Sequence, residues 1–158
     1  MTAKYSVTFS QCDKGKIHNI AKQCAFHAGC YDCFTLTGNL GAGKTFFASC
    51  FIPEFLKMNE SVSSPTFSIS QYYHSNLAKA PLWHFDLYRL EYVSEVEETG
   101  LVEALEQGVT LIEWSDIAQY YLPEDRIDIV FAFEENSDYR TLRIIGDAPW
   151  IQQLNQIS

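Results

Sequence analysis

The stretch that decides the fold is Gly38-Asn39-Leu40-Gly41-Ala42-Gly43-Lys44-Thr45. It fits G-x-x-x-x-G-K-[ST], the P-loop pattern that binds nucleotide phosphates. Its glycines let the backbone curl so that successive N–H groups point into one concavity, which suits anionic oxygens. The pattern requires a strand before it and a helix after it, and residues 33–37 and 45–51 predict both. A glycine-rich turn with a surface lysine is the plainer alternative.

The loop and the first turn of the following helix are expected to contact the nucleotide. Lys44 can reach the terminal phosphates, and Thr45 offers a hydroxyl to Mg²⁺. A helix that starts at Lys44 adds the positive end of its dipole. We therefore expect nucleotide contacts from Asn39, Leu40, Gly41, Ala42, Gly43, Lys44, Thr45 and Phe46.

Composition and charge limit the class of protein. The 158 residues are 47% hydrophobic and 15% aromatic, which predicts one globular domain over residues 1–158. A net charge of −9 argues against tight nucleic-acid binding by this chain alone, because neutralising phosphates needs clustered Lys and Arg. No apolar run has the length of a membrane span, and the polar start has no signal-peptide core. We expect a cytoplasmic protein that is monomeric alone.

The five cysteines include one C-x-x-C, Cys30-Tyr31-Asp32-Cys33. A redox motif of this type should open a helix, whereas here it runs into the strand before the P-loop. A zinc site would need a second pair of ligands at a suitable spacing, and the other Cys and His residues do not provide one. We interpret these side chains as ordinary, partly buried thiols of a reduced protein.

The order of predicted elements gives the fold class. Hydrophobic periodicity predicts helices over residues 17–28 and 101–107 and after Pro149, and strands near 5–9, 67–73, 82–88, 109–114, 127–133 and 141–145. Ser94 and Glu97 form a candidate capping box for a further short helix. Two adjacent strand pairs are connected too briefly for parallel crossovers. We therefore expect an α/β, P-loop NTPase-like three-layer sandwich with a mixed, partly antiparallel sheet.

Two carboxylates stand where buried strands are predicted to end. Asp86 follows Leu82–Phe85, and Glu113 follows Val109–Ile112. Hydrolysis needs a carboxylate near the metal and a group that orients water. One acid can hold Mg²⁺ while the other polarises the attacking water, and spacing does not say which does which. The alternative for either is a carboxylate that caps a nearby helix.

Three further positions could belong to the site. Ser64-Pro65-Thr66 falls where nucleotide-sensing segments often lie, so Thr66 could reach the γ-phosphate or the metal; a simple turn is the alternative. His84 lies two residues before Asp86 on the same strand face. It could touch the site or be a satisfied structural histidine. Arg89 could contact phosphate or pair with the acidic stretch that follows it.

That acidic stretch carries six glutamates and no Lys or Arg between residues 91 and 106. Such a run is usually a solvated face. Its functional interpretation is a docking surface for a basic partner.

The identity of the nucleotide follows from motifs that are missing. The N-K-x-D tetrapeptide that reads guanine does not occur, and the arginines do not cluster as in the lid of a small-molecule kinase. ATP is therefore favoured, with adenine held near Ser10 and Gln11. A small-molecule kinase and a nucleotide-dependent docking switch with negligible turnover stay open as alternatives.

Several segments together resemble one family. G-N-L-G-A-G-K-T at Gly38–Thr45, S-P-T-F at Ser64–Phe67, H-F-D-L-Y-R-L at His84–Leu90 and I-E-W at Ile112–Trp114 occur in the order and spacing of the TsaE (YjeE) family. Its members are small bacterial ATPases of tRNA threonylcarbamoyladenosine synthesis. They work with the TsaB and TsaD proteins, and the ATPase is thought to reset that complex between turnovers.

The resemblance implies roles for individual residues. Lys44 binds the β- and γ-phosphates of ATP or ADP, while Thr45 and Glu113 hold Mg²⁺. Asp86 becomes the catalytic or water-positioning carboxylate, so Lys44, Asp86 and Glu113 form the expected catalytic set. Partners, and not this chain, would grip the tRNA. A second nucleotide contact could lie near Asp138–Arg140.

Overall fold

The computed structural model describes residues 4–59, 61–62 and 68–157. The seven strands in these ranges join one sheet in the order β1-β7-β6-β2-β5-β4-β3. Their bounds are β1 (Tyr5–Cys12), β2 (Cys33–Thr37), β3 (Ser70–Tyr73), β4 (Leu82–Asp86), β5 (Val109–Glu113), β6 (Ile127–Phe133) and β7 (Arg140–Gly146). The central pairs β6–β2, β2–β5 and β5–β4 are parallel. The pairs β1–β7, β6–β7 and β3–β4 are antiparallel, which confirms the mixed sheet.

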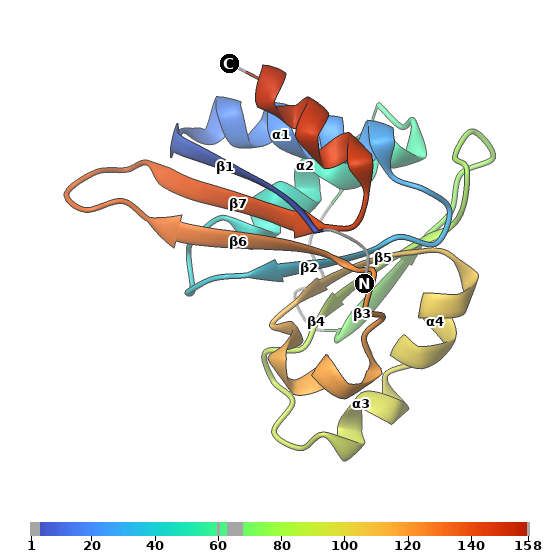
Figure 1. Ribbon diagram of the computed structural model, residues 1–158. Coiled ribbons are helices and arrows are strands. Elements are labelled where there is room, and N and C mark those ends of the chain that lie inside the picture. Colours follow the sequence, from blue (N-terminus) through green and yellow to red (C-terminus); the bar gives the residue numbers. More distant parts are fainter. Residues whose placement is uncertain (1–3, 60, 63–67, 158) are drawn as a thin grey trace.

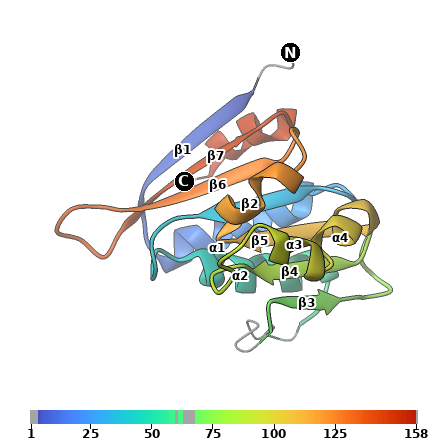
Figure 2. The same ribbon diagram turned by 90° about the horizontal axis from the view of Figure 1, so that it is seen from below.

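Helices cover both faces of this sheet (Figure 1). One face carries α1 (Lys14–His27), α2 (Lys44–Leu56) and the C-terminal 3₁₀ helix η2 (Pro149–Gln156). The other carries α3 (Ser94–Glu98), α4 (Leu101–Gln107) and the 3₁₀ helix η1 (Ser115–Tyr121). Seen from below, α3, α4 and η1 lie in front of the sheet, with α1 and α2 behind it (Figure 2). The predicted three-layer α/β sandwich is confirmed.

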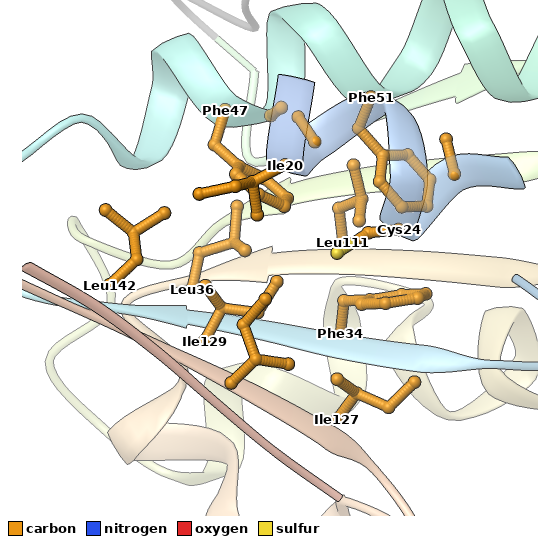
Figure 3. Packing of buried hydrophobic residues seen from close by; sticks show 14 of the residues in the cluster. Ile20, Cys24, Phe34, Leu36, Phe47, Phe51, Leu111, Ile127, Ile129 and Leu142 are labelled. Carbon is orange, nitrogen blue, oxygen red and sulfur yellow. The ribbon is translucent and has the colours of Figure 1, made fainter. Parts of the chain in front are cut away.

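Alternation along the central strands builds two separate cores. Phe34 and Leu36 of β2 point into the larger core beneath α1 and α2, whereas Cys33 belongs to the smaller core under α3, α4 and η1. In the larger core, Phe34 packs edge-on against Phe51 of α2 with ring centroids 5.0 Å apart (Figure 3). Burial of these rings fixes α2 over the sheet, and with it the loop that precedes α2.

The direction of the strands places the site. Because β2, β5 and β4 are parallel neighbours, their carboxyl ends meet at one edge of the sheet. The loop after β2 is the P-loop, while β4 and β5 end at Asp86 and Glu113. Ligands of open α/β sheets bind at this edge.

One local prediction was wrong. Ser94 does not cap α3; it is the helix's first residue, and no side-chain cap bond is made there. Glu95 instead stabilises the turn before the helix, since its Oε2 accepts the backbone N–H groups of Glu91 and Tyr92 at 2.8 and 2.7 Å. The turn that leads into the helix is therefore held by a carboxylate one residue further along.

Candidate functional site

The P-loop needs glycine where its backbone comes closest to the sheet. Gly38 has φ +156°, and a Cβ atom there would lie 2.7 Å from the carbonyl oxygen of Phe131 in β6. Gly43, directly before α2, has φ +110°, which side-chain-bearing residues rarely adopt. These two positions allow the loop to curl between β2 and the N-terminus of α2.

Lys44 is held across the mouth of the loop. Its Nζ donates to the carbonyl oxygens of Gly38 and Asn39, the latter at 3.0 Å. The ammonium also lies 4.2 Å from the centre of the Trp114 ring, a cation–π contact. Burial lowers the pKa of Lys44, and the nearby carboxylates of Glu113 and Asp86 oppose that shift. A cation kept out of water in this way is ready to bind an anion.

Glu113 is tied to the P-loop helix. Its Oε1 accepts the hydroxyl of Thr45 at 2.7 Å, and its Oε2 lies 3.2 Å from Nε2 of His84. Thr45 and Glu113 thus present a hydroxyl and a carboxylate at one point, which is the hard oxygen donor set that Mg²⁺ takes together with phosphate oxygens. These two residues fit the cation that the motif implies.

Asp86 lies beside Glu113 but in different surroundings. The two residues are direct partners in the β4–β5 register. Asp86 is only partly buried, and its Oδ1 accepts the backbone N–H of Tyr88 at 3.1 Å. Glu113 is 1% exposed with both oxygens engaged. The more accessible acid is better placed to meet a water molecule, and the deeper one to hold a cation.

A hollow of about 300 Å³ joins these groups. Its lining brings together the predicted residues Leu40, Gly41, Gly43, Lys44, Thr45, Phe46, Asp86 and Glu113. Tyr88 and Trp114 also line it, with ring centroids 4.9 Å apart. Trp114 has the uncommon φ of +56° for a residue with a side chain, so the turn after β5 aims its ring at the lysine.

Other predicted contacts lie away from this hollow. Ala42 is fully buried and Asn39 is exposed; neither lines the hollow. Ser10 and Gln11 lie at an irregularity of β1, where the N–H of Gln11 donates to Glu134 at 2.6 Å. Neither residue lines the hollow, so the adenine contact stays a prediction. Thr66 lies outside the described residues, as do Ser64 and Pro65. Arg89 is exposed.

The β6–β7 hairpin brings Arg140 to the P-loop through contacts that the sequence did not predict. Arg140 donates from Nη2 to the carbonyl oxygen of Gly41 at 3.4 Å. Its guanidinium lies 4.2 Å over the ring of Phe133. The segment around Asp138–Arg140 stood out in the sequence, but the stacking on Phe133 did not. A second cation thus borders the P-loop, supported by an aromatic ring from the paired strand.

The C-x-x-C lies at the opposite end of β2. Cys30 is exposed and Cys33 is buried, and neither forms a disulfide. Burial raises the pKa of Cys33 to about 12. Among the described residues, no group of three or more His, Cys, Asp or Glu side chains could hold a metal ion.

Across the described part of the chain, every helix is too short or too polar to cross a bilayer.

Known proteins resemble this chain over most of its length. The family described as "Threonylcarbamoyl adenosine biosynthesis protein TsaE" matches residues 12–142. The tRNA threonylcarbamoyladenosine biosynthesis protein TsaE of Rickettsia prowazekii is 36% identical over 124 residues, which cover 78% of this chain and 85% of that protein. The Bacillus subtilis protein of the same name is 44% identical over 112 residues, or 70% and 68% of the two chains.

The fold agrees with a solved structure. The crystal structure of YdiB from Bacillus subtilis superposes with a TM-score of 0.73 at 28% identity, covering 99% of this chain and 95% of that one. The matched residues 12–142 include the P-loop, Asp86 and Glu113. The chain therefore belongs to the TsaE family.

Proposed function

We propose that this chain is a Mg²⁺-dependent ATPase that assists a threonylcarbamoyl-transferase complex in making N6-threonylcarbamoyladenosine in tRNA. The observation that carries the proposal is the meeting of Lys44, Thr45, Asp86 and Glu113 around one hollow at the carboxyl edge of the sheet. A P-loop positions phosphates, and a strand-end carboxylate pair adds what hydrolysis needs. The relatives named for threonylcarbamoyladenosine biosynthesis suggest where that hydrolysis is used.

Each side chain has a task that its surroundings support. The N–H groups of the loop and of the first turn of α2 bind phosphate oxygens, and Lys44 exchanges its carbonyl partners for the terminal phosphates. Thr45 and Glu113 hold Mg²⁺, which when bound neutralises charge on the phosphate oxygens. Asp86, the more accessible acid, orients the attacking water. Arg140 offers a further positive charge beside Gly41.

The partner surface in this proposal is the face of α3, α4 and η1, called here the acidic face. Its acidic side chains include Glu91, Glu95, Glu97, Glu98, Glu103, Glu106 and Asp116 of η1, and its exposed hydrophobic side chains include Tyr92, Val93, Val102 and Tyr120. Acidic and aromatic side chains together suit a basic protein surface. Tyr88 lies three residues before Glu91 and also lines the hollow, so a partner seated at this end of the acidic face would lie near the nucleotide. We propose TsaB and TsaD as the partners, which would also supply the contact with tRNA.

The decisive experiment measures phosphate release from ATP by the purified chain, alone and with TsaB, TsaD and tRNA. We expect slow release alone and faster release in the complex, because P-loop enzymes often need a group from a partner. Lys44→Ala should abolish nucleotide binding, while Lys22→Ala, on the exposed side of α1, should not affect it.

Two other results would redirect the proposal. Labelled phosphate that appears on a small molecule instead of in solution would identify a kinase. Tight, nucleotide-dependent association with no turnover even in the complex would identify a docking switch. Wild-type hydrolysis by Lys44→Ala would contradict the P-loop assignment itself.

A further inference from the structure

His84 is a buried polar side chain to which the proposed function gives no task. It lies in β4, two residues before Asp86, and both His84 and Glu113 are 1% exposed. Its Nε2 lies 3.2 Å from Oε2 of Glu113. The other oxygen of that carboxylate accepts the Thr45 hydroxyl at 2.7 Å. The Glu113 carboxylate therefore contacts the P-loop helix through one oxygen and the neighbouring strand β4 through the other.

The sheet register makes this contact specific. Asp86 pairs with Glu113 and His84 pairs with Leu111, so all four residues point to the same face of the sheet. That face is the one covered by α2, because Leu82 and Leu111 belong to the larger core. The imidazole thus reaches the carboxylate from within the core.

The second ring nitrogen identifies the form of the imidazole. Nδ1 of His84 is buried and has no hydrogen-bond partner among the described residues. Leaving a buried N–H donor unpaired is costlier than leaving an acceptor unpaired, since unpaired N–H groups are the rarer exception in proteins. The hydrogen belongs on Nε2, where the Glu113 carboxylate accepts it.

That one-sided bonding argues against a purely structural histidine. A core position chosen only for packing would be filled at less cost by an apolar side chain, with no orphaned nitrogen. The position instead keeps an imidazole with a single bond, and that bond goes to the residue that faces Thr45. Side chains that donate to a metal-binding carboxylate orient it and tune its affinity.

We propose that His84 is a positioning residue: by donating Nε2–H to Oε2 of Glu113, it fixes the plane of the carboxylate so that Oε1 faces Thr45 and the divalent cation. The cation part of this inference rests on the proposed function. His84 does not touch the nucleotide in this role, and it acts only through Glu113.

The test separates metal binding from nucleotide binding. His84→Leu removes the donor at similar size, His84→Asn places an amide one bond short of Glu113, and His84→Gln places its amide nitrogen where Nε2 was. For each variant, ATP affinity is measured with excess chelator and then against Mg²⁺ concentration. We expect Leu and Asn to raise the Mg²⁺ needed for half-saturation by about 10- to 100-fold. Affinity without Mg²⁺ should stay within about twofold, and Gln should restore most of the Mg²⁺ dependence.

A spectroscopic measurement on the wild-type chain needs neither turnover nor metal. The ¹⁵N chemical shifts of the His84 ring should report hydrogen on Nε2, and Glu113→Gln should change them.

Three outcomes would contradict the role of His84. Hydrogen on Nδ1 would overturn the proposal even if no variant folded. An unchanged Mg²⁺ requirement in folded His84→Asn and His84→Leu, or an equal loss of affinity without Mg²⁺, would overturn it as well. A wild-type chain that shows no Mg²⁺-dependent ATP binding would contradict the proposed function and the cation role together, whereas unaffected variants of a binding-competent chain contradict only the role of His84.

Discussion

The two ends of strand β2 carry two short motifs, of which the sequence favours only the P-loop as a functional site, and their surroundings in the structure differ. After Thr37 comes the P-loop, and before Cys33 comes the C-x-x-C. At the P-loop end, side chains from β4, β5 and β7 converge on the motif: Asp86, Glu113 and Arg140. At the cysteine end, Cys30 is exposed, Cys33 is buried in the smaller core, and the two thiols face different surroundings.

The difference shows what makes a short motif a site. At the P-loop end the charged side chains of Lys44 and Glu113 are buried, and Glu113 bonds Thr45 of α2 across 68 positions of sequence. Proteins bury such groups at functional positions, where the arrangement has a use. The cysteine end has the motif without the convergence. Substitutions at the P-loop end of β2 should therefore impair ATP binding or hydrolysis, whereas substitutions at the cysteine end should not.

The largest expected effect separates the two acids at the P-loop end. Asp86→Asn should lower turnover in the partner complex by about 100-fold or more, while Mg²⁺–ATP binding stays within a few-fold, because the water-orienting carboxylate acts mainly in the transition state. Glu113→Gln should raise the Mg²⁺ requirement as well as lower turnover. Phosphate release at varied Mg²⁺ measures both.

Asp32→Asn at the cysteine end is the matched control. Asp32 accepts the N–H of Gly29 at 2.8 Å and lies directly before β2, at the end opposite the P-loop, so turnover should not change. If Asp86→Ala and Glu113→Ala both hydrolyse ATP at the wild-type rate in the complex, the assignment of the acids is wrong.

The sequence predicted those parts of the fold and site that depend on local pattern or short connections. Connections too short for a crossover predicted the antiparallel pairs, and the apolar run ending in Glu113 predicted a buried strand. Asp86 and Glu113 could be named as strand-end acids. Their adjacency depends on β4 lying directly beside β5, and spacing along the chain does not determine strand order.

The contacts that could not be predicted from the sequence depend on how distant segments of the chain lie in space. Arg140 reaches Gly41 across 99 positions, and its stacking on Phe133 depends on the register of the β6–β7 hairpin. For His84 the sequence left two interpretations open, because only the β4–β5 register brings its ring to Glu113. The capping box failed for a different reason: α3 begins at Ser94 with Val93 as its N-cap, and Glu95 accepts two backbone N–H groups of the preceding turn.

A smaller effect, on stability, contrasts one glycine from each end of β2. Gly38→Ala should lower the free energy of unfolding by about 2–3 kcal/mol, since its Cβ would lie 2.7 Å from the backbone oxygen of Phe131 and neither can yield cheaply. In Gly29→Ala the nearest atom is Oδ1 of the Asp32 side chain at 3.3 Å, so the loss should stay below about 1 kcal/mol. Denaturant unfolding measures both.

The two glycine variants should also differ in ATP binding, with the larger loss again in Gly38→Ala. Gly38→Ala should weaken ATP binding by distorting the loop that supplies the N–H groups, and Gly29→Ala should leave it unchanged. Equal stability losses in the two variants would show that the close approach of Gly38 to β6 is not a constraint.

The smallest effect on function concerns the cysteines. At pH 8 a thiol reagent should label Cys30 of the folded chain quickly and Cys33 only when the chain opens, because Cys33 is 3% exposed. Cys30→Ser and Cys33→Ala should leave ATP binding unchanged. Joint loss of nucleotide binding, or rapid labelling of both thiols, would mean that the cysteine end is also a site.

The burial of Cys33 should instead affect how the free energy of unfolding depends on pH. Burial raises its pKa from 9.0 to about 12, so in the folded chain the thiol keeps its proton where the unfolded chain has lost it. The stabilising contribution of the thiol is therefore fully present below pH 9 and is lost as the pH rises toward 12, at a limiting slope of about 1.4 kcal/mol per pH unit. Denaturant unfolding of wild type and Cys33→Ala between pH 8 and roughly pH 11 should show the wild-type advantage shrinking with pH. An advantage that stays constant across that range would mean that water reaches the thiol in the folded chain, and the contrast between the two ends of β2 would then rest on the P-loop alone.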